Sequence, residues 1–212
     1  MKTKNILTIL IAFAGIGFLL SCNSSGTNQN VASQSDHEAS IEDVELPDSV
    51  YLNMGKKIAV GSQTVLGKNL VEAINKGGAE YAVTFCNVEA IPLTDSMAHI
   101  LKASIKRVTD KPRNSDNQAN ESQLALIRKM KEEMKAGNTP KPKVVEMNGK
   151  MVGYYAIVTN QLCLQCHGDK NTTIEPKTYK KIKALYPSDK ATGYAANELR
   201  GMWVVQMDKE YR

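Results

Sequence analysis

Cys163, Cys166 and His167 have the clearest capacity for chemistry in this chain. They stand in the order Cys-Leu-Gln-Cys-His, so two thiols lie three positions apart and an imidazole follows the second. Two cysteines at this spacing can each form a thioether with a vinyl group on one edge of a porphyrin, and the adjacent histidine can present a ring nitrogen to the iron. The spacing therefore predicts one covalently attached c-type haem.

Three other interpretations of the same residues stay open at this point. Cys163 and Cys166 could form a disulfide beside an unrelated histidine, or a thioredoxin-type redox pair. The redox pair belongs where a strand opens a helix in a βαβ unit, whereas residues 168–171, Gly-Asp-Lys-Asn, indicate a loop. A zinc ion could use the three residues with Cys86, but the sequential Cys166 and His167 would have to bend onto one tetrahedron. We favour haem, because the chain also carries an export signal, which would place the motif in the compartment where c-type haem is attached.

That signal occupies residues 1–21 and has the form of a lipoprotein signal peptide. Two lysines precede an apolar run over residues 6–20, which is too short to span a membrane comfortably. The run ends in Leu-Leu-Ser-Cys22, the form of a lipobox. We therefore expect cleavage before Cys22 and lipidation of its sulfur, which would anchor the protein to the inner or outer membrane in the bacterial periplasm. A plain secretory peptide with an incidental cysteine is the alternative.

Residues 22–47 are rich in Asn, Ser, Gln and acids and predict a disordered tether. The tether holds five acidic and no basic residues, whereas the whole chain has a formal net charge of +5. The domain from 48 to 212 is therefore basic and could lie near anionic headgroups or bind an acidic partner. No interleaving of basic and aromatic residues occurs, so we expect no nucleic-acid partner.

The pattern of elements in residues 48–212 predicts an α+β domain. Helical periodicity and breakers predict helices over residues 51–75, 79–90, 92–102, 121–136 and 177–185. Strands are predicted over 104–109, 144–147, 151–158 and 201–207, the middle two forming a hairpin through Asn148-Gly149. Helices followed by an antiparallel sheet give the class α+β, with the Cys-rich motif in a loop after the hairpin.

Short segments across residues 83–205 resemble one family in both composition and order. They lie at 106–109, 113–114, 117, 121, 163–168, 185–189, 191–194 and 199–201. They are similar to the c-type haem domain family with a PAS-like fold, which occurs in cyanobacterial haem proteins and as the periplasmic sensory part of some histidine kinases. The resemblance implies a PAS-like antiparallel sheet with N-terminal helices and a haem-bearing loop.

The resemblance also implies the second axial ligand of the iron. In the family a cysteine in the N-terminal helical part can bind the metal, and Cys86 occupies the equivalent place, so the ligands would be His167 and Cys86. A thiolate ligand would lower the reduction potential of the iron, whereas methionine would raise it. From the residues alone, Cys86 could equally be a buried free thiol, and His99 or a methionine could be the ligand.

Arg113 is the residue that we expect to pair with a haem propionate, because a guanidinium fork matches a carboxylate. A surface arginine in an Asx-type turn is the alternative, and Arg107 and Arg200 are weaker candidates for the same role. Asp189 and Tyr194 follow the family pattern as structural or pocket residues. Two tyrosines just before the motif could line the haem face.

A haem with both axial positions filled by side chains exchanges electrons and binds no gas until one ligand leaves. We therefore expect a redox or gas-ligand sensor in which Cys86 detaches and the signal passes to an unidentified protein partner. The alternative is a lipid-anchored electron-transfer cytochrome. We expect no enzymatic activity, because the sequence shows no convincing acid-base set for peroxide chemistry, and His99 with Arg107 is the only pairing to test.

Overall fold

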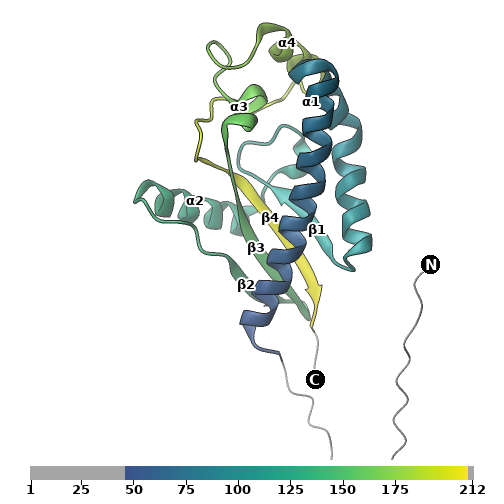
Figure 1. The fold of residues 1–212 in the computed structure, drawn as a ribbon. Helices are drawn as coiled ribbons and strands as arrows, with labels where there is room; N and C mark the ends of the chain where they lie inside the picture. The colour runs from purple at the N-terminus through teal and green to yellow at the C-terminus, as the bar shows by residue number, and fades with distance from the viewer. Residues whose placement is uncertain (1–45, 210–212) are drawn as a thin grey trace, which may run out of the picture. The chain divides into compact units, whose positions relative to one another are not determined.

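The computed structural model describes residues 46–209. The predicted signal peptide, Cys22 and all but the end of the predicted tether lie outside these residues. The elements in chain order are α1 (Asp48–Ile100), β1 (Ser104–Val108), a 3-10 turn (Ser115–Asn117), α2 (Glu121–Lys135), β2 (Lys143–Met147), β3 (Lys150–Val158), α3 (Gln161–His167), α4 (Pro176–Leu185) and β4 (Leu199–Asp208), as Figure 1 shows.

The four strands form one antiparallel sheet in the order β1-β4-β3-β2. This arrangement confirms the predicted α+β class and the predicted hairpin. Asn148 and Gly149 both have positive φ, 53° and 71°, as a two-residue hairpin turn of type I′ requires. The last strand in sequence lies between β1 and β3, so it is paired along both of its edges.

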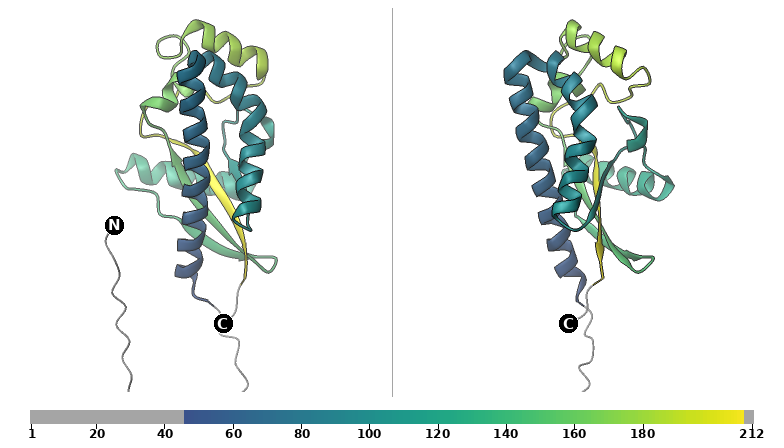
Figure 2. Two further views of the ribbon diagram at one scale, coloured as in Figure 1. Left: turned by 45° about the vertical axis from the view of Figure 1, so that its right-hand side comes forward. Right: turned by 90° about the vertical axis from the view of Figure 1, so that its right-hand side faces the viewer.

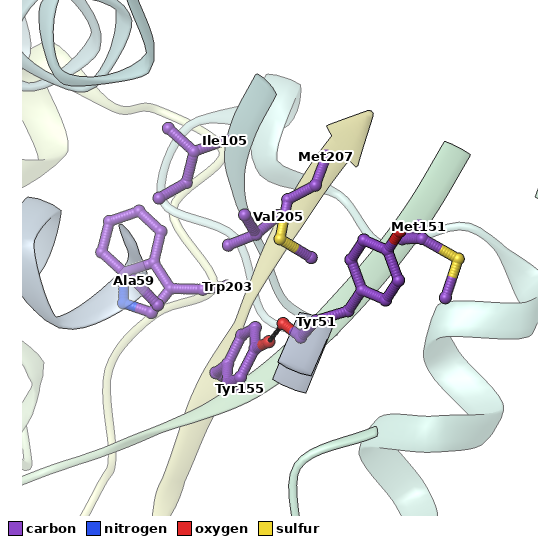
Figure 3. Close-up of a cluster of buried hydrophobic side chains, with 8 residues drawn as sticks. All are labelled: Tyr51, Ala59, Ile105, Met151, Tyr155, Trp203, Val205 and Met207. Atoms are coloured by element: carbon purple, nitrogen blue, oxygen red, sulfur yellow. Dashed lines mark hydrogen bonds between the residues drawn. The ribbon is translucent and has the colours of Figure 1, made fainter. Parts of the chain in front are cut away.

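Side chains alternate between the two faces of the sheet along each strand, so a hydrophobic layer forms on each face. Trp203, Val205 and Met207 of β4 face α1 and contribute to the cluster drawn in Figure 3. Met202 points to the opposite face, where Ile127 of the amphipathic helix α2 packs. Because side chains in a strand alternate between faces, the period of two in β3 and β4 is what allows helices to cover both sides of the sheet.

Helix α1 is two arms joined at a break rather than the three helices predicted. Gly77 and Gly78 have non-helical backbone angles, and Gly78 has a φ of 73°, so the chain reverses there. We define the first arm as residues 48–76 and the second arm as residues 79–100; the two arms lie side by side in both figures (Figures 1 and 2). The expected break before Pro92 is wrong, since the second arm continues through it and the Thr94 hydroxyl donates to the Ala90 carbonyl at 2.7 Å.

Within residues 46–209, no helix combines the length and the apolar character needed to cross a membrane.

Candidate functional site

Cys163, Cys166 and His167 lie on the short helix α3, which directly follows β3. The expectation that the motif lies in a loop is wrong, because Asn160 caps this helix: its Oδ1 accepts from the backbone N–H of Cys163 at 3.2 Å. The loop begins only after Gly168. The strand before α3 belongs to a wholly antiparallel sheet, so the motif does not lie in the βαβ unit that a thioredoxin-type pair requires.

A cavity of about 270 Å³ lies between both arms of α1, helix α3 and the adjoining ends of β1, β3 and β4. It is lined by every residue predicted to hold the cofactor: Cys86, Arg113, Cys163, Cys166 and His167. The structure therefore brings together a thiol from α1 and the motif of α3. Much of the remaining lining is apolar, including Ile74, Val83, Ile91, Ile157 and Leu162.

The His167 ring is oriented by a backbone group. Its Nδ1 lies 2.7 Å from the carbonyl oxygen of Ala191, and because a carbonyl only accepts, Nδ1 carries the proton. The Tyr194 ring meets the imidazole edge-on, with centroids 6.4 Å apart. Burial by the surrounding protein lowers the pKa of His167 well below its ordinary value, and the charges of Arg113 and Arg200 lower it further. The lowered pKa favours the neutral imidazole, and the hydrogen bond from Nδ1 leaves Nε2 as the unprotonated nitrogen, the form that binds metals.

The thiols of the cavity are not bonded to one another. Cys86, Cys163 and Cys166 are all free, so the geometry lends no support to the disulfide interpretation. Nor does any group of three His, Cys, Asp or Glu side chains among residues 46–209 form a cluster suited to a metal ion such as zinc. Burial raises the pKa of Cys166 to about 11. Burial also raises the pKa of Cys86, although the positive charge of Arg107 acts on Cys86 in the opposite direction.

Arg113 lines the cavity, but it already has a carboxylate partner. Its Nε donates to Asp189 Oδ1 at 3.1 Å, and its Nη2 donates to the Cys166 carbonyl at 2.5 Å. The Asp189 side chain is only 2% exposed and also accepts from the backbone N–H of Ala191 at 3.0 Å. Asp189 therefore links Arg113 to the residue whose carbonyl orients His167. The pairing of Arg113 with a propionate stays a prediction.

Other candidates lie elsewhere. His99 is exposed near the end of α1 and does not line the cavity, so the structure does not bring it together with Arg107. Tyr154 and Tyr155, the two tyrosines before the motif, pack on opposite faces of the sheet, and neither lines the cavity. The Tyr155 hydroxyl instead bonds to the backbone of the first arm. It donates to the Leu52 carbonyl at 3.0 Å and lies 3.5 Å from the Tyr51 carbonyl, the bond drawn in Figure 3.

Sequence reasoning missed the part played by Ala191. Its contribution is a backbone carbonyl, which leaves no signal in the identity of a side chain. Arg107 and Arg200 both line the cavity, although we expected them to be weaker candidates than Arg113 for pairing with a propionate. Arg107 follows the alternation of β1 and lies over the Trp203 ring of β4, so this position could have been anticipated from the strand pattern.

The fold and the site define a class of α+β domain in which a Cys-x-x-Cys-His helix faces a cysteine-bearing helix across an apolar cavity. The chain belongs to the Tll0287-like family, whose family model matches residues 25–207. This match confirms the resemblance to the c-type haem domain family.

A solved structure shares the fold. The crystal structure of the cyanobacterial heme-protein Tll0287 is similar with a TM-score of 0.54 and 19% sequence identity, covering 79% of this chain and 99% of that chain. At this identity the likeness concerns the fold alone. No curated protein matches the sequence significantly.

Proposed function

We propose that this protein holds one c-type haem in the cavity, bonded through Cys163 and Cys166 and ligated by His167 and Cys86. The observation that carries the proposal is the His167 ring, whose Nδ1 bonds to the Ala191 carbonyl while the ring faces a cavity lined by thiols. Such an outer hydrogen bond is typical of metal-ligating histidines. Membership of the Tll0287-like family supports the proposal, and so does the fact that the similar cyanobacterial protein is a heme-protein.

The residues of the cavity fit such a group. Apolar side chains from α1 and β3 suit the faces of a macrocycle, and Cys163 and Cys166 lie on successive turns of one helix. A bound haem supplies one-electron exchange and, when an axial position opens, binding of gases such as CO or NO. A neutral His167 binds metal without first losing a proton, whereas Cys86 must be deprotonated to bind.

We propose further that the protein is a redox or gas-ligand sensor in which Cys86 is the ligand that leaves. The raised pKa of Cys86 favours its neutral, protonated form once it is away from a metal. The second arm of α1 bears Cys86 and begins at the Gly77–Gly78 break, which would allow the arm to shift. An unidentified protein partner would receive the signal, and we propose no enzymatic role.

The anchored location is part of the same proposal. Lipidation at Cys22 would hold the domain at a membrane in the periplasm, where c-type haem is attached. The alternative function is a lipid-anchored electron-transfer cytochrome with no signalling role. The packing of Val83 in the second arm against Ile174 and Ile182 favours this alternative, because it resists movement of the arm.

The test uses the full chain produced in a bacterium that attaches c-type haem. We expect an added porphyrin mass that survives denaturation, and a low-spin thiolate signature by EPR that disappears in Cys86→Ala. Val88→Ala is the matched control, since Val88 lies two residues away in the same arm and is 60% exposed. Colourless protein without the added mass would refute the haem, and unchanged low-spin signals in Cys86→Ala would remove Cys86 as ligand.

Sensor and carrier are separated by adding CO to the reduced holoprotein. A sensor should show a shifted Soret band and a changed helix arrangement, for example in hydrogen exchange over the second arm. An unchanged spectrum and unchanged exchange would refute switching and favour the electron-transfer alternative.

A further inference from the structure

Three arginines line the cavity, and within the described part of the chain only one of them forms an ion pair with a carboxylate. Arg107, Arg113 and Arg200 all contribute to the lining, and Arg113 pairs with Asp189. Among residues 46–209, no carboxylate lies within ion-pair distance of Arg107 or Arg200. Both Arg107 and Arg200 are partly buried. Charges withdrawn from water in proteins are normally paired, since an isolated one loses part of its hydration free energy. The cavity therefore carries two more positive charges than its own residues neutralise.

The partners that Arg107 and Arg200 do have are weak ones. The Arg107 guanidinium lies over the Trp203 ring, 5.6 Å from its centroid, and the Arg200 guanidinium lies 5.4 Å from the centroid of Tyr194. Arg200 also donates from Nη1 to Thr109 at 3.0 Å, but its Nε is buried without a hydrogen-bond partner. An aromatic face stabilises a cation without neutralising it, so the charge and the free donor remain available.

Arg113 is less suited to a propionate than the sequence suggested. Its Nε is bonded to Asp189 and its Nη2 to the Cys166 carbonyl. A porphyrin of this type carries its vinyl groups and its two propionates on opposite edges. A guanidinium held at the backbone of Cys166 therefore lies beside the residue that would bond to the vinyl edge.

We propose that Arg107 and Arg200 bind the two propionates of the haem, whereas Arg113 positions Asp189 and the Ala191 carbonyl. This inference rests on the proposed haem function. Burial lowers the pKa of both Arg107 and Arg200, and pairing with carboxylates would reverse part of that cost. Two propionates also match the two unneutralised charges of the cavity.

The test uses the full chain with Cys163→Ala and Cys166→Ala, so that porphyrin binds reversibly. Haemin and haemin dimethyl ester are titrated by absorbance, because the ester has the same macrocycle without carboxylates. We expect haemin to bind on the order of 10- to 100-fold more tightly than the ester. Arg107→Gln and Arg200→Gln should each reduce this preference by about ten-fold and leave affinity for the ester nearly unchanged.

Control variants keep the test decisive. Arg128→Gln changes an exposed arginine of α2 outside the cavity and should leave the preference intact. Arg107→Lys and Arg200→Lys keep the charge and should retain part of it, which separates lost charge from lost folding. Equal binding of haemin and ester by the parent would overturn this inference while the haem site stands. Failure of both ligands to bind would instead overturn the proposed function, and the inference with it.

Discussion

Replacing Asp189 by Asn should destabilise the domain far more than a single exposed charge would. The Asp189 carboxylate is 2% exposed, and its partner Arg113 is 13% exposed. Removing one member of a buried ion pair costs about 3–5 kcal/mol, because the other charge is left without compensation. Arg113 would retain its bond to the Cys166 carbonyl, so we expect the lower end of the range, about 3 kcal/mol.

Urea unfolding of the full chain, followed by far-UV circular dichroism, measures this loss. With an m-value of about 2 kcal/mol per molar urea, the midpoint should fall by roughly 1.5 M at unchanged m. Asparagine has nearly the volume of aspartate and can still accept from the N–H of Ala191, so the loss would report the charge rather than packing.

Glu72→Gln is the matched control for the Asp189 prediction. It breaks the Lys68–Glu72 pair, whose side chains are 77% and 61% exposed and whose charged atoms lie 4.0 Å apart. Exposed pairs of this kind contribute about 0.5 kcal/mol or less. Equal midpoint shifts for the two variants, or a loss below about 1 kcal/mol for Asp189→Asn, would refute the reasoning that Arg113 depends on this partner.

Three further predictions address the supports of the site. Gly201→Ala places a Cβ 2.4 Å from the Val108 carbonyl oxygen, at a φ of 158°. Urea unfolding should show a loss of about 2 kcal/mol or more in the free energy of unfolding. The control Gly61→Ala adds a Cβ in open space on α1 and should be neutral or stabilise the protein by up to about 1 kcal/mol. Asn160→Ala removes the cap of α3 and should cost about 1 kcal/mol, and an unchanged midpoint would contradict the capping role. The folded-state pKa of His167 is depressed, so without haem its contribution to stability is present above the unfolded pKa of about 6.5 and lost as pH falls below it. Between neutral and mildly acidic pH, the urea midpoint should therefore fall more in the wild type and in His99→Gln than in His167→Gln.

Local patterns predicted the sheet well. The positive-φ pair Asn148-Gly149 defines the hairpin turn, and the alternating apolar residues of β3 and β4 give both strands and their two buried faces. Helix α3 was missed because seven residues are too few for a helical period to show, and its only local signal was the cap at Asn160. Pro92 predicted a break, yet the second arm stays helical through it, and beyond it Thr94 is buried and Ala98 packs against the cluster on the sheet.

The site shows a similar division between local and distant information. Cys163, Cys166 and His167 are adjacent in sequence, so their spacing alone predicts their chemistry. The partner of Arg113 lies 76 positions away, and no local pattern could show that the guanidinium is already occupied. Arg107 and Arg200 were expected to be weaker candidates than Arg113, although among residues 46–209 these two form no ion pair with a carboxylate.

His167 and Cys86, on the two sides of the cavity, are held in place by different interactions, and this difference decides which of them would leave more easily as a ligand. His167 is held by the Ala191 carbonyl, which Asp189 and Arg113 fix in turn through hydrogen bonds and a buried ion pair. Cys86 lies on an arm that begins at the Gly77–Gly78 break, where Val83 packs against Ile174 and Ile182 and Asn87 hydrogen-bonds to Tyr186. This packing resists movement of the arm, but a small slide preserves most apolar contacts, whereas a buried ion pair does not break without a large cost. Release of Cys86 therefore requires less rearrangement than release of His167, and a bistable element in this domain should be sought in the second arm of α1.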